Sequence, residues 1–545
     1  MISRQKEYFH YYKKYYCTKC HQFTIREHWD DFFECENDCE IIHKQIKHSI
    51  AKGKFNGFFE REEIDNHFDC SEYDFFTFFP VKEIKFKTLS KKNSETLNKM
   101  FHRKNHTEIK IDDCIIKYLN KNNLSEPPNE INNFGYMINL IEDIHYFLVK
   151  SCQELTLYDI ALDVNRKRES KMFYSARFFF NNSIEYCWYA YERLVVYLGL
   201  IFDYPFSKDL PKNKTFQILN YLKKNEKYKQ SKFKDLLAKY NGTSKSFIND
   251  HRQENTHSMS AHISKLNTSI RNDKIERNKI LSNNANYMDE KQLKPISAQI
   301  IQSVETLYCI FEHIIEHLYE DTAQYEDKTI PMLKEYYIQS EVQLESKTKI
   351  DMDYISFLKK SVFIKFAKHF GNDTLKNGQI LLDVFFRLEE VQKCLNDTYN
   401  IFTEKFHIFW YQEIGVDLRP YFDDKSLVYA GQWRIYGCLD KFASYYEKKY
   451  KTNKIKYFAD FKKTNEHLDE IVREKIKKII DSPAYAILES YRNQTAHNLR
   501  LGVLYGENGV QIENYNILSA LYELLLDCFD LLLLELNDNS EMISV

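Results

Sequence analysis

The sequence predicts a mostly α-helical protein with a smaller N-terminal region of mixed structure. The chain has only 13 Gly and 9 Pro beside 40 Tyr and 40 Phe, so it is short of the turn residues that many-stranded sandwiches and barrels need. Beyond Lys171, apolar residues recur with helical spacing over long segments. These segments form two series, and the second series repeats features of the first. We therefore expect helical bundles and not a sheet-based core.

Three regions are expected from the length of the chain and from shifts in its composition. At 545 residues the chain is longer than an ordinary single domain. Residues 1–150 are mixed in character, and a Pro127-Pro128 pair there precedes the first helical pattern. Residues 151–325 hold the first helical series and residues 326–545 hold the second. We predict one N-terminal domain and two helical domains.

The charge and the apolar pattern limit the classes of partner. The formal net charge is -2, so nucleic acid would have to be bound by local patches and not by a global basic field. The N-terminal segment lacks a secretory signal, and no apolar run is long enough to span a membrane. We expect a soluble, cytoplasmic protein. Most cysteines lie singly in helical pattern and are predicted to be reduced core thiols; examples are Cys187, Cys309, Cys394, Cys438 and Cys528.

A diverged internal repeat relates the two helical series. The segment AYERLVVYL, which begins at Ala190, matches CLDKFASYY, which begins at Cys438, so Glu192 falls on Asp440. Further along, SFINDHRQENTH aligns with AILESYRNQTAH, and each series ends on a strongly apolar helical segment. Landmarks that recur in the same order indicate duplicated structural units.

Each copy of the repeat carries an arginine followed five positions later by a histidine. The pairs are Arg252 with His257 and Arg492 with His497. This spacing is short enough to occur by chance, but two pairs at the same place in a repeat are hard to obtain by accident. Positions i and i+5 lie about 140° apart on a regular helix, so the two side chains converge more easily at a helix end.

The paired motifs resemble the Arg-x4-6-His signature of the HEPN superfamily of four-helix-bundle ribonucleases, in which Asn often follows the arginine, as Asn493 does here. The resemblance covers Lys171 to Asp321 and Asp351 to Asn539. The first copy departs from it, because Gln253 replaces the asparagine. The resemblance implies two HEPN-like helical bundles packed as a pseudo-dimer, in a monomer or a homodimer.

The resemblance also implies a site and a reaction. The site would form where the two bundles meet; its catalytic residues would be Arg252, His257, Arg492 and His497, supported by Glu192, Asp440 and Asn493. The reaction would be metal-independent cleavage of single-stranded RNA, with no cofactor. Histidine would transfer protons to and from the ribose 2′-hydroxyl and the leaving oxygen, and arginine would grip the phosphate. Family roles include anti-phage defence and toxin-like RNA degradation, under control of a regulatory protein or a nucleic-acid activator.

Two other interpretations stay open from the sequence. The arginines could pair with Glu192 and Asp440 as buried helix clamps, with the histidines capping helix ends. The whole chain could also be a non-catalytic scaffold that binds RNA or protein. Transfer of a nucleotide group is disfavoured, because the sequence has no Gly-rich loop that would cradle phosphates.

Two lysine-rich stretches with interleaved aromatic residues precede the motifs. They run from Lys212 to Lys245 and from Glu447 to Lys478. Such stretches could follow an RNA backbone while the aromatic rings stack on bases. A solvated helical face would have the same composition.

Four N-terminal cysteines have a spacing typical of a structural zinc site. They form two pairs, Cys17 with Cys20 and Cys35 with Cys39, and four thiolates can bind one tetrahedral zinc ion. The pattern departs from the usual one, because three residues separate the second pair and neither pair contains a glycine. Three nearby histidines could replace a missing ligand: His21, His28 and His43. The alternative is four reduced thiols.

Overall fold

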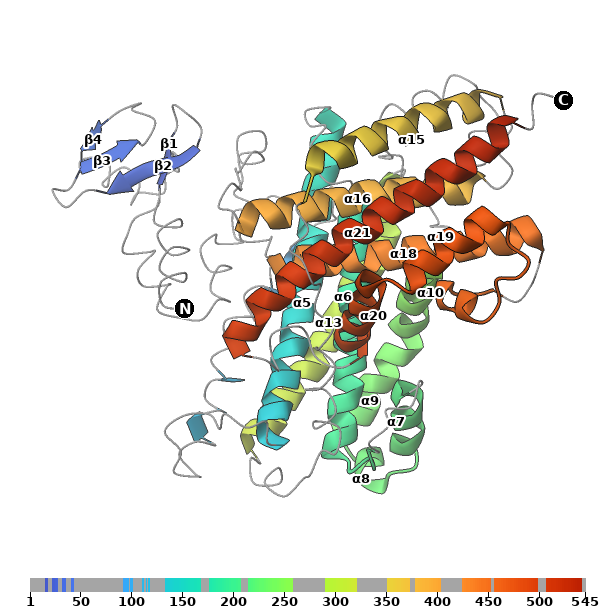
Figure 1. Ribbon diagram of the computed structural model, residues 1–545. Helices are drawn as coiled ribbons and strands as arrows, with labels where there is room; N and C mark the ends of the chain where they lie inside the picture. Colours follow the sequence, from blue (N-terminus) through green and yellow to red (C-terminus); the bar gives the residue numbers. More distant parts are fainter. Residues whose placement is uncertain are drawn as a thin grey trace. The chain divides into compact units, whose positions relative to one another are not determined.

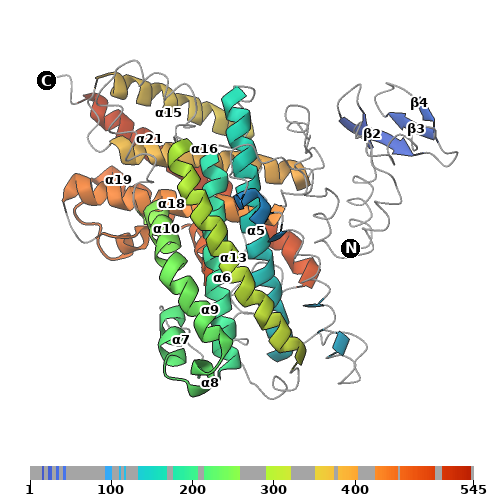
Figure 2. The same cartoon turned by 180° about the vertical axis from the view of Figure 1, so that it is seen from behind.

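The computed structural model describes the chain in segments (Figures 1 and 2). In the N-terminal part it describes four strands and short helical runs between residues 92 and 117. The main described ranges are 133–167, 176–206, 214–257, 290–320, 350–372, 378–402, 424–451, 455–497 and 506–541. Helices account for most of these residues, which confirms the predicted mostly helical class.

The first helical series contains four main helices and a group of short ones. The main helices are α5 (Asn133–Lys167), α6 (Ala176–Ile201), α10 (Ser246–His257) and α13 (Glu290–Glu320). Between α6 and α10 lie α7 (Lys214–Leu222), α8 (Glu226–Lys229), α9 (Lys232–Tyr240) and the π-helical turn η4 (Asn241–Lys245). We call α5 to α13 the first module.

The second helical series follows the same order. Its main helices are α16 (Gly378–Phe402), α18 (Asp424–Tyr450), α20 (Pro483–His497) and α21 (Gly506–Glu541). The 3-10 turn η8 (Phe458–Lys462) and α19 (Glu470–Ile480) lie between α18 and α20, and α15 (Met352–Asn372) precedes the series. We call α15 to α21 the second module.

The N-terminal strands form an antiparallel meander. They are β1 (Tyr15–Cys17), β2 (Gln22–Glu27), β3 (Phe32–Cys35) and β4 (Ile41–His43), in the order β1-β2-β3-β4. The register pairs Ile25 with Cys35 and Phe33 with Ile42. The described strands all lie between residues 15 and 43, and the mixed N-terminal domain stays a prediction.

The chain divides into two compact units. One comprises residues 1–85, 164–173 and 397–426, and the other comprises residues 86–163, 174–396 and 427–545. Both helical modules fall largely in the second unit. The predicted boundaries at residues 150 and 325 stay predictions; residue 150 falls inside α5.

Helix α6 forms the centre of the first module. It is apolar around most of its circumference, a pattern typical of a helix covered on all sides, and every residue from 182 to 201 is buried. The two views show α5, α6 and α13 running alongside one another (Figures 1 and 2). The Ser151 hydroxyl on α5 donates to the Ser183 carbonyl on α6, and His145 Nε2 lies 3.2 Å from the Tyr308 hydroxyl on α13.

Two further expectations concern cysteines and membranes. None of the seven cysteines whose side chains the structure describes forms a disulfide, and six of them are buried. Burial raises the pKa of the Cys187 thiol to about 12, and that of Cys438 likewise. Within the described helices, none combines the length and apolar character needed to cross a membrane.

Candidate active site

Arg252 is held against the central helix of the first module. Its Nε donates to Glu185 Oε2 at 3.1 Å, and its guanidinium carbon lies 5.3 Å from the centre of the Trp188 ring. The side chains of Arg252 and Glu185 are 13% and 8% exposed, so the pair is largely shielded from water. Burial alone would lower the pKa of Arg252, but Glu185, Tyr189 and Glu192 raise it above its usual value.

Helix α10 owes its direction to the π-helical turn before it. The helices α9, η4 and α10 follow one another without a break from Lys232 to His257. Tyr191 on α6 donates from its hydroxyl to Asn241 Oδ1 at 3.1 Å, and Lys245 Nζ lies 5.4 Å from the centre of the Tyr191 ring. A π-turn shifts the helical register within one helix, and here the shifted segment carries Arg252.

Arg492 occupies the matching position in the second module. Its guanidinium carbon lies 4.0 Å from the centre of the Tyr436 ring on α18. Tyr436 precedes Asp440 by four residues, just as Trp188 precedes Glu192 by four. The repeat that the sequence predicts is therefore matched by an aromatic ring under the motif arginine in each module.

A second pair of matching contacts supports the same register. In the first module Arg193 Nε donates to Asp143 Oδ2 at 2.8 Å. In the second module Lys441 Nζ lies 2.9 Å from Asp383 Oδ2. Arg193 and Lys441 each follow the aligned acid directly, and their partners lie on α5 and α16. Each of these four side chains is at most 2% exposed.

The two modules contact each other through α6 and α18. Trp433 packs its ring 5.1 Å from the centres of both Tyr186 and Tyr189. Arg434 crosses the same contact: its guanidinium donates to Asn182 Oδ1 at 2.8 Å and to the Phe178 carbonyl at 3.1 Å, and it pairs with Glu390 at 2.6 Å. Side chains of the second module therefore pack against residues of the first module and donate hydrogen bonds to them.

The charges of both motif arginines act on Tyr189 of α6. Burial raises the pKa of the Tyr189 phenol, and the charge of Glu185 raises it further. The charges of Arg252 and Arg492 both act in the opposite direction on that same phenol. Electrostatic influence of this kind requires short separations, and α6 also contacts α20 directly. The arginines of both copies thus lie near one point on α6.

The two arginines differ in one charged neighbour, the carboxylate of Glu185. Glu185 lies seven residues before Glu192, and the residue seven before Asp440 is Trp433. The second module therefore has no acid at the position of Glu185. Among the described residues, Arg492 makes no ion pair and is half-buried over its tyrosine.

The predicted supporting acids, Glu192 and Asp440, have different surroundings, and their supporting role stays a prediction. Glu192 is buried and its charge acts on Arg252, although the carboxylate that contacts Arg252 is that of Glu185. Asp440 Oδ1 accepts from the Phe458 N–H at 3.0 Å and so holds the start of η8. Glu185 was missed from the sequence; a search for acids two helical turns from Glu192 on the same face would have found it.

The histidines of the two motifs end their helices. Helix α10 ends at His257 and α20 ends at His497. The side chains of His257, His497 and Asn493 lie outside the described residues. Their roles therefore stay predictions.

The two lysine-rich stretches have different surroundings. In the second, lysines are paired with acids of α20 and α21: Lys462 with Glu489, Lys475 with Asp530, and Lys478 with Asp527. In the first, α9 buries Phe233, Leu237 and Tyr240 and exposes lysines on its other side. The first stretch therefore keeps more uncompensated positive charge.

The N-terminal cysteines are described only at the level of the strands. Cys17 ends β1 and Cys35 ends β3, while Cys20 and Cys39 and all four side chains lie outside the described residues. In an antiparallel meander the β1–β2 and β3–β4 connections lie at the same end of the sheet. Among the side chains that the structure does describe, no group of three His, Cys, Asp or Glu is arranged to hold a metal.

Comparisons with known protein families, with curated proteins and with solved structures found no match to this chain.

Proposed function

We propose that the protein is a metal-independent endoribonuclease that cleaves single-stranded RNA at a composite site made by both modules. The proposed catalytic residues are Arg252, His257, Arg492 and His497. One observation carries the proposal: the arginines of two separate motifs have equivalent settings in their own modules, yet both charges act on Tyr189.

The proposed reaction uses the 2′-hydroxyl of the RNA as nucleophile. One histidine takes the hydroxyl proton and the other protonates the leaving 5′-oxygen, because an imidazole has a pKa near neutrality. The arginines stabilise the charge that builds on the phosphate oxygens. The products would carry 2′,3′-cyclic phosphate and 5′-hydroxyl ends.

The two arginines are proposed to have unequal tasks. Arg492 stacks on Tyr436, and we assign it to the phosphate that is cleaved. Arg252 shares its charge with Glu185 at 3.1 Å, so it would orient the site and bind phosphate more weakly.

The supporting roles follow the resemblance and stay proposals. Anti-phage defence or toxin-like RNA degradation would require control by a regulatory protein or a nucleic-acid activator. We also propose a structural zinc ion on the N-terminal cysteines, because the sheet topology brings the two connections that carry them to one end. Equal zinc content in the parent and in the Cys17→Ser/Cys20→Ser variant would rule this ion out.

The second candidate function is a non-catalytic helical scaffold that binds RNA or protein. The buried Arg252–Glu185 pair favours it, because such a pair can serve as a helix clamp alone. A scaffold would bind RNA whether or not the histidines are present, and it would yield no product.

Incubation of the purified protein with single-stranded RNA in EDTA tests the proposal. We expect cleavage by the parent, with 2′,3′-cyclic phosphate ends, and none by the His257→Ala/His497→Ala variant purified in the same way. No cleavage by the parent, or equal cleavage by both proteins, would exclude the proposed enzyme. The double variant also serves as the control for contaminating nucleases.

A further inference from the structure

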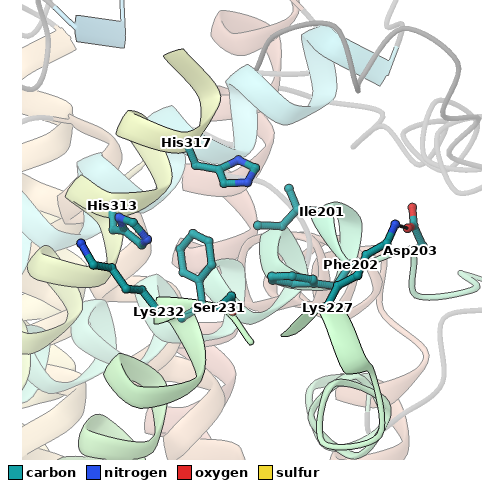
Figure 3. Close-up of a pocket in the computed structure, with 9 residues that line it drawn as sticks. Ile201, Phe202, Asp203, Lys227, Ser231, Lys232, His313 and His317 are labelled. Atoms are coloured by element: carbon teal, nitrogen blue, oxygen red, sulfur yellow. Dashed lines mark ion pairs between the residues drawn. The ribbon is translucent and has the colours of Figure 1, made fainter. Parts of the chain in front are cut away.

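A cavity of about 580 Å³ lies at the end of α6 that is distant from the motif arginines. Its walls come from four places: the end of α6 with the residues after it, α8, the start of α9, and the half-buried His313 and His317 of α13 (Figure 3). Twelve residues of helix separate Tyr189 from Ile201, which is about 18 Å along the axis. This cavity is therefore separate from the site proposed above, and its volume is in the range of small-molecule sites.

The lining combines aromatic rings with cations. Phe202 and Phe233 form an apolar floor, and the imidazoles of His313 and His317 lie over Phe233 with ring centres 4.7 and 6.0 Å from its own. Lys227 and Lys232 are exposed at the rim. Among the described residues that line the cavity, the single carboxylate is that of Asp203.

The rim carries two lysines with carboxylates nearby: Asp203 lines the cavity, and Glu316 lies 3.5 Å from His313 with its side chain 54% exposed. Asp203 pairs with Lys227 at 3.7 Å, but the two side chains are 53% and 79% exposed, so the solvent screens this pair strongly. Figure 3 shows Lys232 close to His313 on the opposite side of the cavity from Lys227. The first turn of α9 also borders the cavity, and the N-terminal end of a helix favours an anion.

We propose that this cavity binds a nucleotide, with the base against the rings and the phosphate between Lys227 and Lys232. Rings stack on any base because every base has a π-face, and lysines supply the sequence-independent attraction to phosphate. A phosphate alone would not use the aromatic floor, and an apolar ligand would not use the lysines. Asp203 and the Ser231 hydroxyl are at the rim to bind ribose hydroxyls or base amino groups.

The nucleotide can come from two sources, and binding measurements distinguish them. The first probe is AMP labelled with N-methylanthraniloyl, and the second is a fluorescein-labelled 2′-O-methyl oligonucleotide of 12 residues. AMP has no 3′-phosphodiester and the oligonucleotide has no free 2′-hydroxyl, so neither probe can be cleaved at the site proposed above. These measurements therefore do not depend on the proposed activity. The two proteins compared with the parent are Lys227→Ala/Lys232→Ala and the matched control Lys224→Ala/Lys234→Ala. The control removes two exposed lysines of the same segment that do not line the cavity.

We expect the cavity variant to bind at least one probe about tenfold more weakly or worse, and the control to bind within about twofold of the parent. A selective loss with AMP identifies a free nucleotide as the ligand. A selective loss with the oligonucleotide alone identifies one nucleotide of a longer strand. Failure of the parent to bind either probe, or equal weakening in both variants, would overturn the proposal.

Discussion

At the scale of single residues, the two arginines of the repeat differ in whether the neighbouring helix carries a carboxylate at the position of Glu185. Arg252 donates to a largely buried carboxylate and lies over Trp188. Arg492 lies over Tyr436 at a shorter distance and has Trp433, an uncharged residue, at the repeat position of that carboxylate. Each motif arginine thus lies over an aromatic ring, but only the first motif has an acidic residue at the repeat position of Glu185.

This difference predicts that one alanine substitution mainly lowers the cleavage rate and that the other mainly lowers the stability. Arg492→Ala should lower the rate of RNA cleavage by on the order of 10²- to 10³-fold, as loss of one charge-stabilising donor does, with little loss of stability. Arg252→Ala should lower the free energy of unfolding by about 3 kcal/mol, because it leaves the Glu185 carboxylate buried without its cation. Cleavage rates and urea unfolding curves measure the two effects. A large loss of stability in Arg492→Ala with unchanged cleavage would contradict the assignment.

At the scale of elements, a glycine on α6 and a glycine on α18 differ in how closely their neighbours approach. A Cβ on Gly199 would lie 3.0 Å from Ile218 Cγ2 and 3.1 Å from Phe206 Cζ. A Cβ on Gly431 would meet Cys394 Cβ at 3.4 Å, an ordinary contact distance. A methyl group at residue 199 would thus displace the side chains of Ile218 and Phe206, whereas α18 has room for a methyl group.

We predict that Gly199→Ala destabilises the protein by about 1–3 kcal/mol, the usual cost of overpacking. Gly431→Ala should be neutral or should stabilise by up to about 1 kcal/mol, because alanine has the higher helix propensity. Thermal or urea unfolding of the two variants measures the difference. If both substitutions had the same sign and size, the packing of α7 on α6 would be wrongly described.

The contact between α16 and α18 contains a buried carboxylate whose charge is held by three cations. Burial alone would raise the pKa of Asp383, but Lys441, Arg387 and Arg177 hold it well below its usual value. A carboxylate with a lowered pKa in the folded protein stabilises the fold at pH values above its unfolded pKa of about 3.9. That stabilisation is lost as the pH falls from there through the lower, folded pKa.

Asp383→Asn should therefore lower the free energy of unfolding by about 3–5 kcal/mol at pH 7, because three buried cations lose one shared carboxylate. The difference between parent and variant should be the same at pH 5 and should narrow below about pH 4. Urea unfolding at pH 7, 5 and 3 measures it. A difference that already narrows between pH 7 and pH 5 would show that another group is responsible.

The elements that the sequence predicted are those whose signal is local. The helical period and the repeat identify α6, α18 and the terminal apolar helices, because each signal lies within one segment. The partner of Arg252 was harder to predict, because it depends on which face of α6 contacts α10. The π-turn η4 changes the helical register just before α10 and therefore affects this contact. The convergence of both arginines on Tyr189 depends on contact between modules and has no local signal.

At the scale of the whole molecule, one chain supplies both halves of the proposed site. Arg434 of the second module donates to two residues of the first, and Trp433 packs between Tyr186 and Tyr189. These contacts link the modules through buried groups within one compact unit. A site assembled in this way would need no second copy of the chain.

The most direct test of the composite site is the cleavage of single-stranded RNA by His257→Ala, by His497→Ala and by an equimolar mixture of the two. If both histidines serve one site within one chain, each variant should be slower than the parent by on the order of 10²- to 10⁴-fold, and the mixture should be no faster than its components. Cleavage at the parent's rate by either single variant, or recovery of activity on mixing, would contradict a composite site within one chain.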